Sequence, residues 1–483
     1  MSTKREQFVN DDFEREATKT SGKIGVRHLQ LVFWFLGNMI GYCLRVSISL
    51  AIVAMVPESP IDAPNSEQYR WNSSQQSTIL SAFFWGYTVM QIPSGYIARV
   101  WSGQKLLAVG MLLCGIFNIL TPIAALFGDM IGVCICRALM GLSQSCLLPC
   151  TQTLLSKWAP PNERARFGAF AYAGGQFGTV LSFPISGALA ASSLGWKSIF
   201  YVFGALAVLW SIMFFIFGFD SPSAHPRISE MEKQYIENSL KTSEDEEGSS
   251  NKAAIKIPWK AIFTSVPMWA LIIVHCCQNW GYWTLITEMP TYMNKVLKYD
   301  MAQNGLMSAL PYLMMWLLSF PISWLADYAL QRGASRGTTR KVCNTIAHWG
   351  PAIALICLAA VPIADSGVVV AMLAIAVGLN AGALCGFQIN HVDLSPNFAG
   401  PMMSITNCIA SVIAIIAPII CGVIIEKHED SRAHWSIVFY LSAVIYFLGN
   451  LIFIIFGQGE VQSWNDPASS ESRNPSKKES IVA

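Results

Sequence analysis

Residues 29–56 read "LQLVFWFLGNMIGYCLRVSISLAIVAMV", a run of apolar and small residues with a single charged side chain, Arg45. A helix of about 20 such residues is long enough to cross the hydrocarbon core of a bilayer. The rest of the chain has the same character, because 53% of its 483 residues are hydrophobic and only 13% are charged. A soluble domain carries about 25% charged residues. The run and the composition together predict a membrane protein.

Apolar runs of membrane-spanning length recur along the whole chain. We count twelve: Leu29–Val56, Thr78–Ile97, Leu106–Phe127, Met130–Leu155, Phe167–Ala190, Ile199–Phe219, Val266–Ile286, Ala302–Leu325, Val342–Ile363, Gly367–Ile389, Met402–Ile425 and Ile437–Phe456. These runs predict an all-α, polytopic membrane protein with twelve transmembrane helices.

The longest polar insert divides the chain into two parts of six spans each. Residues 29–219 form the predicted N-terminal half, 220–265 the cytosolic linker and 266–456 the predicted C-terminal half. Within the linker, Ser229 and Glu232 have the spacing of a capping box and predict the start of a short amphipathic helix. Such a two-half arrangement is typical of transporters that bind substrate near the middle of the membrane.

The distribution of basic residues predicts the orientation. If the tails 1–28 and 457–483 lie in the cytosol, cytosolic segments hold 24 of the 32 Lys and Arg residues and outer loops hold 6. Because cytosolic loops are enriched in Lys and Arg, both termini are predicted to be cytosolic. Asn72, in the sequence Asn-Ser-Ser, then lies in the first outer loop and is a candidate glycosylation site.

The two remaining basic residues, Arg45 and Arg137, lie inside predicted spans. Counted from the outer ends of their spans they are about 16 and 10 Å deep, at 1.5 Å per helical residue. No Asp or Glu lies inside a predicted span of the N-terminal half. A buried cation needs a partner, which is either backbone carbonyl oxygens or an anionic substrate. We favour the substrate, because a guanidinium group binds carboxylate or phosphate through two parallel hydrogen bonds.

Several motifs resemble one group of proteins. The spacing of Ser323 and Asp327, followed by Arg332, is similar to the loop signature of the major facilitator superfamily, and "RALMG" (137–141) resembles its fourth-helix motif. The stretches "FFWGYTVMQIPSGYIA" (83–98), "SKWAPPNERAR" (156–166), "GWKSIFYVFG" (195–204) and "GFQINHVDLSP" (386–396) resemble its anion transporters: sialin, the vesicular glutamate transporters and the sodium–phosphate cotransporters.

The resemblance implies a major facilitator fold and alternating access to a central site. It also implies that Arg45 and Arg137 recognise the anion and that Tyr87 lines the cavity. For Tyr87, a membrane-buried tyrosine with a local hydrogen bond is an equally good interpretation. The resemblance assigns Asp327 and Arg332 to a loop that takes part in gating.

Two positions depart from the group. Seven residues after Arg137, sialin and the vesicular glutamate transporters carry a glutamate that takes part in proton coupling, whereas this chain has Gln144. An amide does not titrate and cannot carry a proton. Gln278 stands where the glutamate transporters have an arginine. At position 144 the chain resembles the sodium–phosphate cotransporters better, and Gln278 disfavours glutamate as the substrate.

The other polar residues of the spans have less specific interpretations. His275 is a candidate proton carrier, although a histidine bonded to a neighbouring carbonyl is the commoner case. We expect His391 and Asp393 to act at a gate or to structure a loop. Side-chain amides could supply oxygen ligands to sodium, although Asn at helix–helix contacts is commoner; these are Asn279, Asn390 and Asn407.

The sequence contains no nucleotide-binding loop, no nucleophile–base pair and no nucleic-acid-binding surface, so we expect no enzyme. We also expect no catalytic residue, no metal site and no cofactor apart from a cotransported ion. The expected function is sodium-dependent phosphate cotransport at the plasma membrane. Two alternatives stay open: proton-coupled transport of an organic anion across a lysosomal or vesicular membrane, and a nutrient sensor that does not transport.

Overall fold

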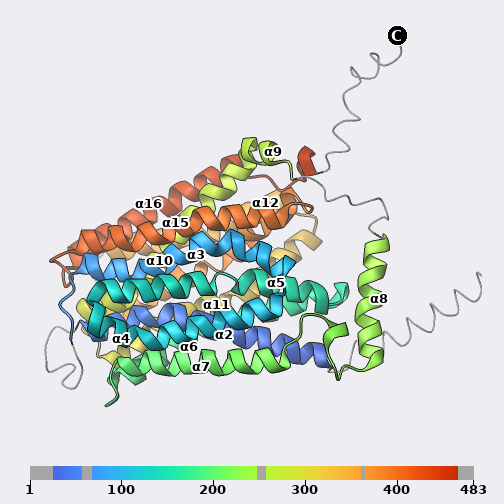
Figure 1. The fold of residues 1–483 in the computed structure, drawn as a ribbon. Helices are drawn as coiled ribbons and strands as arrows, with labels where there is room; N and C mark the ends of the chain where they lie inside the picture. The colour runs from blue at the N-terminus through green and yellow to red at the C-terminus, as the bar shows by residue number, and fades with distance from the viewer. Residues whose placement is uncertain (1–24, 57–67, 247–256, 361–364, 466–483) are drawn as a thin grey trace, which may run out of the picture.

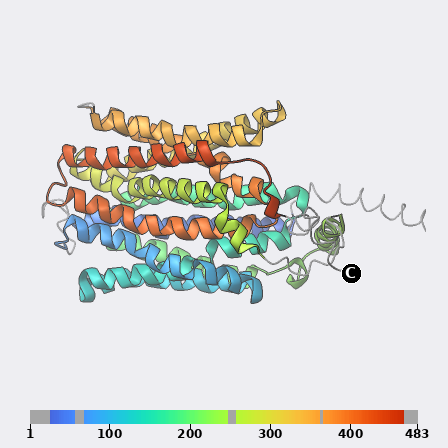
Figure 2. The same ribbon diagram turned by 90° about the horizontal axis from the view of Figure 1, so that it is seen from above.

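The computed structural model describes residues 25–56, 68–246, 257–360 and 365–465. Within these ranges the chain consists of long helices that run in a common direction, with the helix α8 lying across one end of the bundle (Figures 1 and 2). We call the ends of the spans that are predicted to face away from the cytosol their outer ends.

The described part of the N-terminal half contains six helices. They are α2 (Val26–Met55), α3 (Ser73–Val100), α4 (Gly103–Gln144), α5 (Leu147–Trp158), α6 (Pro161–Ala191) and α7 (Lys197–Phe217). Helix α4 is two predicted spans joined at Asp129, whose backbone is not helical (φ 45°, ψ −141°). Helix α5 extends the second of these spans. The linker contains η1 (Pro222–Ala224), α8 (Glu230–Glu246) and α9 (Trp259–Thr264).

The C-terminal half follows the same plan. Its helices are α10 (Val266–Lys295), α11 (Met301–Gln331), α12 (Arg336–Ala360), α13 (Ser366–Leu379), η2 (Leu384–Gln388), α14 (Ile389–Leu394), α15 (Ala399–Ile425), α16 (Arg432–Phe456) and η3 (Ser463–Asn465). The tenth predicted span is not one continuous helix. A π-helical segment, η2, interrupts it at Gly386, whose ψ of −115° is not helical.

Eight helical stretches of the described chain are long and apolar enough to cross a membrane. One of them, 103–158, contains two of the predicted spans. Helices α3, α6 and α10 cover three more predicted spans but fall outside these eight. Their lower hydropathy has a structural reason, because all three pack against the other half and carry polar or small residues there.

The two halves meet along α3 with α15 and along α6 with α11 (Figure 1). At the outer end of the second pair two glycines face each other: a Cβ built on Gly187 would lie 3.0 Å from the Cα of Gly305 and 2.7 Å from the carbonyl oxygen of Met301. At the first pair, a Cβ on Gly422 would lie 2.4 Å from the Oγ of Ser77. The absence of side chains at these glycines allows close packing of the halves.

The linker helix begins as predicted, since the Ser229 Oγ accepts a hydrogen bond from the Glu232 amide at 3.2 Å. It ends at Glu246. Glu232 is 4% exposed, and its carboxylate accepts hydrogen bonds from the backbone amides of Val26 and Arg27 at 3.0 and 3.1 Å. The linker therefore caps the first helix of the N-terminal half.

Candidate anion-binding site

Arg45 lies in the interior of the helix bundle, where its side chain is only 5% exposed. Its Nε and Nη2 donate hydrogen bonds to the Oε1 of Gln144 at 3.0 and 2.8 Å. Within the described residues its Nη1 has no hydrogen bond, and Arg45 takes part in no ion pair. A guanidinium group is always charged in proteins, so this interior carries a positive charge that no neighbouring carboxylate neutralises.

Four aromatic rings surround the same guanidinium. Its Cζ lies 4.9 Å from the ring centroid of Tyr42, 4.8 Å from Phe83 and 4.7 Å from Tyr87. The ring of Trp283, which comes from the C-terminal half, lies 5.8 Å away. Ring faces attract a cation without neutralising it. Tyr87, predicted to line the cavity, is therefore in contact with Arg45, and Trp283 brings the other half to the same place.

Gln144 is fully buried and is held in one orientation. Its Nε2 donates a hydrogen bond to the Gly41 carbonyl at 2.7 Å, which leaves Oε1 to accept from Arg45. The sequence placed Gln144 on the same helix face as Arg137. Its contact with Arg45 on another helix depends on tertiary packing and could not be read from the sequence.

Arg137 lies at the same level as Arg45 but makes different contacts. Its Nη1 and Nη2 donate hydrogen bonds to the carbonyl oxygens of Leu44 and Arg45 at 3.2 and 3.0 Å. Its Nε is buried and has no partner among the described residues. Arg137 is 1% exposed, and its two hydrogen bonds hold the backbone that carries Arg45. In this conformation the partners of Arg137 are backbone carbonyl oxygens, which is the alternative to an anionic substrate.

The polar residues that the sequence singled out on α10 make contacts within the C-terminal half. His275 is 4% exposed, and its ring centroid lies 5.0 Å from that of Phe387. Gln278 donates a hydrogen bond to Asn380 at 2.6 Å, and Tyr446 donates to the same oxygen at 3.2 Å. Asn279, predicted to serve coupling, is half-buried. The structure thus ties His275 and Gln278 to helices of the C-terminal half.

The predicted gate residues do not form one cluster. Asp393 pairs with the Nε of Arg340 at 2.7 Å, which ties α14 to α12. His391 contacts the Thr406 Oγ1 at 2.9 Å, joining α14 to α15. Asp327 and Arg332 lie on the exposed end of α11, where the Arg332 guanidinium stacks on Tyr328 at 5.0 Å.

Asn72 is exposed at the start of α3. Its side-chain oxygen accepts a hydrogen bond from the Gln75 amide at 2.8 Å and so caps the helix. Its Nδ2, to which a glycan would be attached, lies 3.4 Å from the Glu426 Oε1. Glycosylation at Asn72 stays a prediction.

One buried acid was missed in the sequence. Glu288 is 3% exposed and accepts a hydrogen bond from the Ser77 Oγ at 2.9 Å. The hydropathy of the seventh span falls after Ile286, and the structure continues α10 to Lys295. The available signal was a lone acid in the otherwise uncharged stretch "TLITEMPTYM" (284–293), which includes Thr284 one helical turn away.

Comparison with known proteins identifies the family. Residues 34–418 match the family model described as Major Facilitator Superfamily. A Drosophila ananassae protein named "Putative inorganic phosphate cotransporter" is 43% identical over 461 residues, covering 91% of this chain and 94% of that protein. Human sialin is 35% identical, and the match covers 91% of this chain and 90% of sialin. Human vesicular glutamate transporter 2 is 32% identical, and the match covers 91% of this chain and 75% of that transporter.

Solved structures share the fold at low sequence identity. A bacterial homologue of the human lysosomal transporter Spinster, in an inward-facing and unoccupied conformation, superposes with a TM-score of 0.66 at 15% identity, covering 90% of this chain and 99% of that one. A D-xylose–proton symporter superposes with a TM-score of 0.64 at 14% identity, covering 89% of this chain and 97% of the symporter. The chain belongs to the major facilitator superfamily, within its anion:cation symporter group.

Proposed function

We propose that this protein is a sodium-coupled transporter of inorganic phosphate that works by alternating access. The observation that carries the proposal is Arg45, a guanidinium enclosed between the halves, held by the neutral Gln144 and paired with no carboxylate among the described residues. Burying an uncompensated charge is costly. An anion that enters from either side supplies the counter-charge, and the unbonded Nη1 can donate to it.

The neutral amide at Gln144 supports sodium as the driving ion, because it cannot exchange a proton during the transport cycle. The name of the 43%-identical Drosophila relative supports phosphate. In this proposal Arg45 is the main ligand, Tyr87 and Trp283 exclude water around it, and Arg137 and Gln144 position it. We further propose that both termini are cytosolic and that the protein works at the plasma membrane.

Proton-coupled transport of an organic anion across a lysosomal or vesicular membrane is the second candidate. Glu288 favours it, since a buried carboxyl group at the contact between halves can bind and release a proton. The similarity to sialin and the vesicular glutamate transporters points in the same direction.

Uptake of radiolabelled phosphate into proteoliposomes tests the proposal. We expect accumulation under an inward sodium gradient, none when choline replaces sodium, and none with Arg45→Ala. Accumulation that follows a proton gradient in the absence of sodium, with sialic acid or glutamate as substrate, would support the second candidate instead. Binding of phosphate without any accumulation would identify a sensor and would overturn both transport functions.

A further inference from the structure

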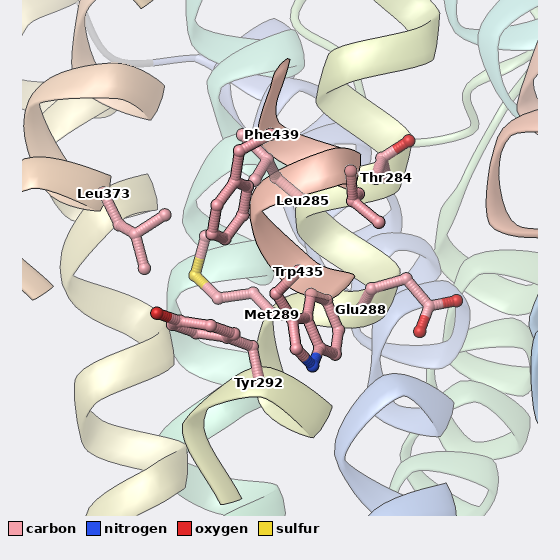
Figure 3. Close-up of a pocket in the computed structure, with 9 residues that line it drawn as sticks. Thr284, Leu285, Glu288, Met289, Tyr292, Leu373, Trp435 and Phe439 are labelled. Atoms are coloured by element: carbon pink, nitrogen blue, oxygen red, sulfur yellow. The ribbon is translucent and has the colours of Figure 1, made fainter. Parts of the chain in front are cut away.

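Glu288 lies where the two halves meet at their outer ends. Its carboxyl group leaves α10 on the side away from Leu373 and Tyr292 (Figure 3) and accepts a hydrogen bond from Ser77 of α3 at 2.9 Å. Gly422 of α15 packs against the same serine. We call the contact formed by Ser77, Glu288 and Gly422 the outer interface.

The charges around Glu288 do not neutralise it. On its own helix, Lys295 pairs with Glu429, with 3.5 Å between Nζ and Oε2. Glu429 comes from the loop that follows α15 and adds a second negative charge near Glu288. From α15 itself the titratable neighbour is Cys421. Within the described residues Glu288 takes part in no ion pair, and its one hydrogen bond comes from Ser77.

An ionised carboxylate cannot remain in such a place at low cost. Burial removes its hydration shell, and a single hydroxyl group does not replace that shell or supply a counter-charge. The closed outer interface therefore accommodates Glu288 as the neutral carboxylic acid.

We propose that the outer face of the transporter closes only when Glu288 is protonated, which makes this residue a proton-binding site that controls the outer gate. When α3 separates from α10 and α15, Glu288 meets outside water and ionises above about pH 5. Its proton passes to the outside solution and is taken up again on closure. Because closure binds one proton, each pH unit changes the closed-to-open ratio by up to about tenfold. This role is independent of the substrate and of the driving ion proposed above.

Cys421 provides a natural reporter of the outer gate, since it is 2% exposed beside the outer interface. The experiment measures its labelling from outside by a membrane-impermeant maleimide over about pH 5 to 8, and Cys421→Ala gives the background from the other cysteines. The rate at each pH is divided by that of the denatured protein, which removes the intrinsic pH dependence of the thiol. We expect labelling to rise by several-fold as the pH increases.

Glu288→Gln keeps the shape and the hydrogen bond of a neutral acid, so we expect its labelling to stay low at every pH. Glu288→Met provides a second neutral side chain should the first variant express poorly. Glu429→Gln is the matched control, because it changes the other carboxyl group at the same place and should retain the pH dependence. An equal pH dependence in both Glu288 variants and the unmodified protein would overturn the proposal. So would labelling of the unmodified protein that responds to sodium and not to pH.

Discussion

Arg45 donates two hydrogen bonds to one oxygen atom of Gln144, from Nε at 3.0 Å and from Nη2 at 2.8 Å. The amide orients the guanidinium but leaves its charge in place, whereas a carboxylate at the same position would neutralise it. The identity of residue 144 therefore decides whether the site attracts an anion at all values of pH or only when an acid there is protonated.

Gln144→Glu tests this relationship. We expect the Michaelis constant for phosphate to rise roughly ten- to a hundredfold near neutral pH, because the new carboxylate competes with the substrate for Arg45 in a charge-assisted contact. The affinity should recover as the pH falls and the carboxyl group is protonated. The measurement is initial uptake against phosphate concentration at several pH values, with the unmodified protein as reference at each pH. An unchanged pH profile would contradict the placement of residue 144 at the site.

Arg45→Lys separates charge from geometry. The lysine keeps the positive charge and its interaction with the rings, but it lacks the planar group that donates two parallel hydrogen bonds. We expect about a ten- to hundredfold loss of phosphate affinity, and no transport from Arg45→Ala. Uptake corrected for expression is the measurement. Normal transport by a stable, well-expressed Arg45→Ala protein would contradict the assignment of Arg45 as an anion ligand.

Arg137→Met tests a positioning role. Loss of the hydrogen bonds to the Leu44 and Arg45 carbonyls should lower stability by about 1.5–3 kcal/mol for each bond made by a charged donor. We expect a lower melting temperature without ligand, while added phosphate still raises it. In Arg45→Lys the same phosphate concentration should raise the melting temperature much less. If phosphate fails to stabilise Arg137→Met, the anion contacts Arg137 directly.

Asp220 lies at the predicted cytosolic face, and we expect Asp220→Asn to lower the stability of the protein in a pH-dependent way. Burial alone would raise the pKa of Asp220, but hydrogen bonds from Lys157, the Gln104 amide and Ser102 lower it below its ordinary value. A carboxylate whose pKa is lowered in the folded protein contributes stability above its unfolded pKa, about 3.9 for aspartate.

The stability that ionised Asp220 contributes disappears as the pH falls through its lowered pKa in the folded protein. We therefore expect Asp220→Asn to melt at a lower temperature than the unmodified protein at pH 7, and the two curves to converge below about pH 4. Thermal unfolding of both proteins in detergent across this range is the measurement. A difference that persists at low pH would mean that the ion pair with Lys157 is not its source.

The apolar runs were sufficient to predict the fold class, because each predicted span coincides with described helix over most of its length. They were insufficient where a polar face packs against the other half. Helix α10 runs nine residues past the predicted end at Ile286, and Ser77 of another helix donates a hydrogen bond to Glu288 in this extension. Hydropathy along one segment contains no information about such a partner.

The site shows the same limit. Counted from the span ends, Arg45 and Arg137 are about 16 and 10 Å deep, and the structure brings them into direct contact. That the unbonded donor is Nη1 in Arg45 and Nε in Arg137 could not be predicted, because it depends on Gln144 and on backbone carbonyls from a different helix. Trp283 was not singled out, since its neighbour across the halves is visible only in the folded chain.

The facing glycines of α6 and α11 have a practical use. A methyl group on Gly187 would lie 2.7 Å from the carbonyl oxygen of Met301 and 3.0 Å from the Cα of Gly305. Both atoms belong to the backbone, which cannot rotate away as a side chain can. Gly187→Ala would therefore act as a wedge that prevents full contact at the outer ends and traps the transporter open to the outside. A one-residue substitution could thereby supply the sample from which the opposite conformation of this protein is determined.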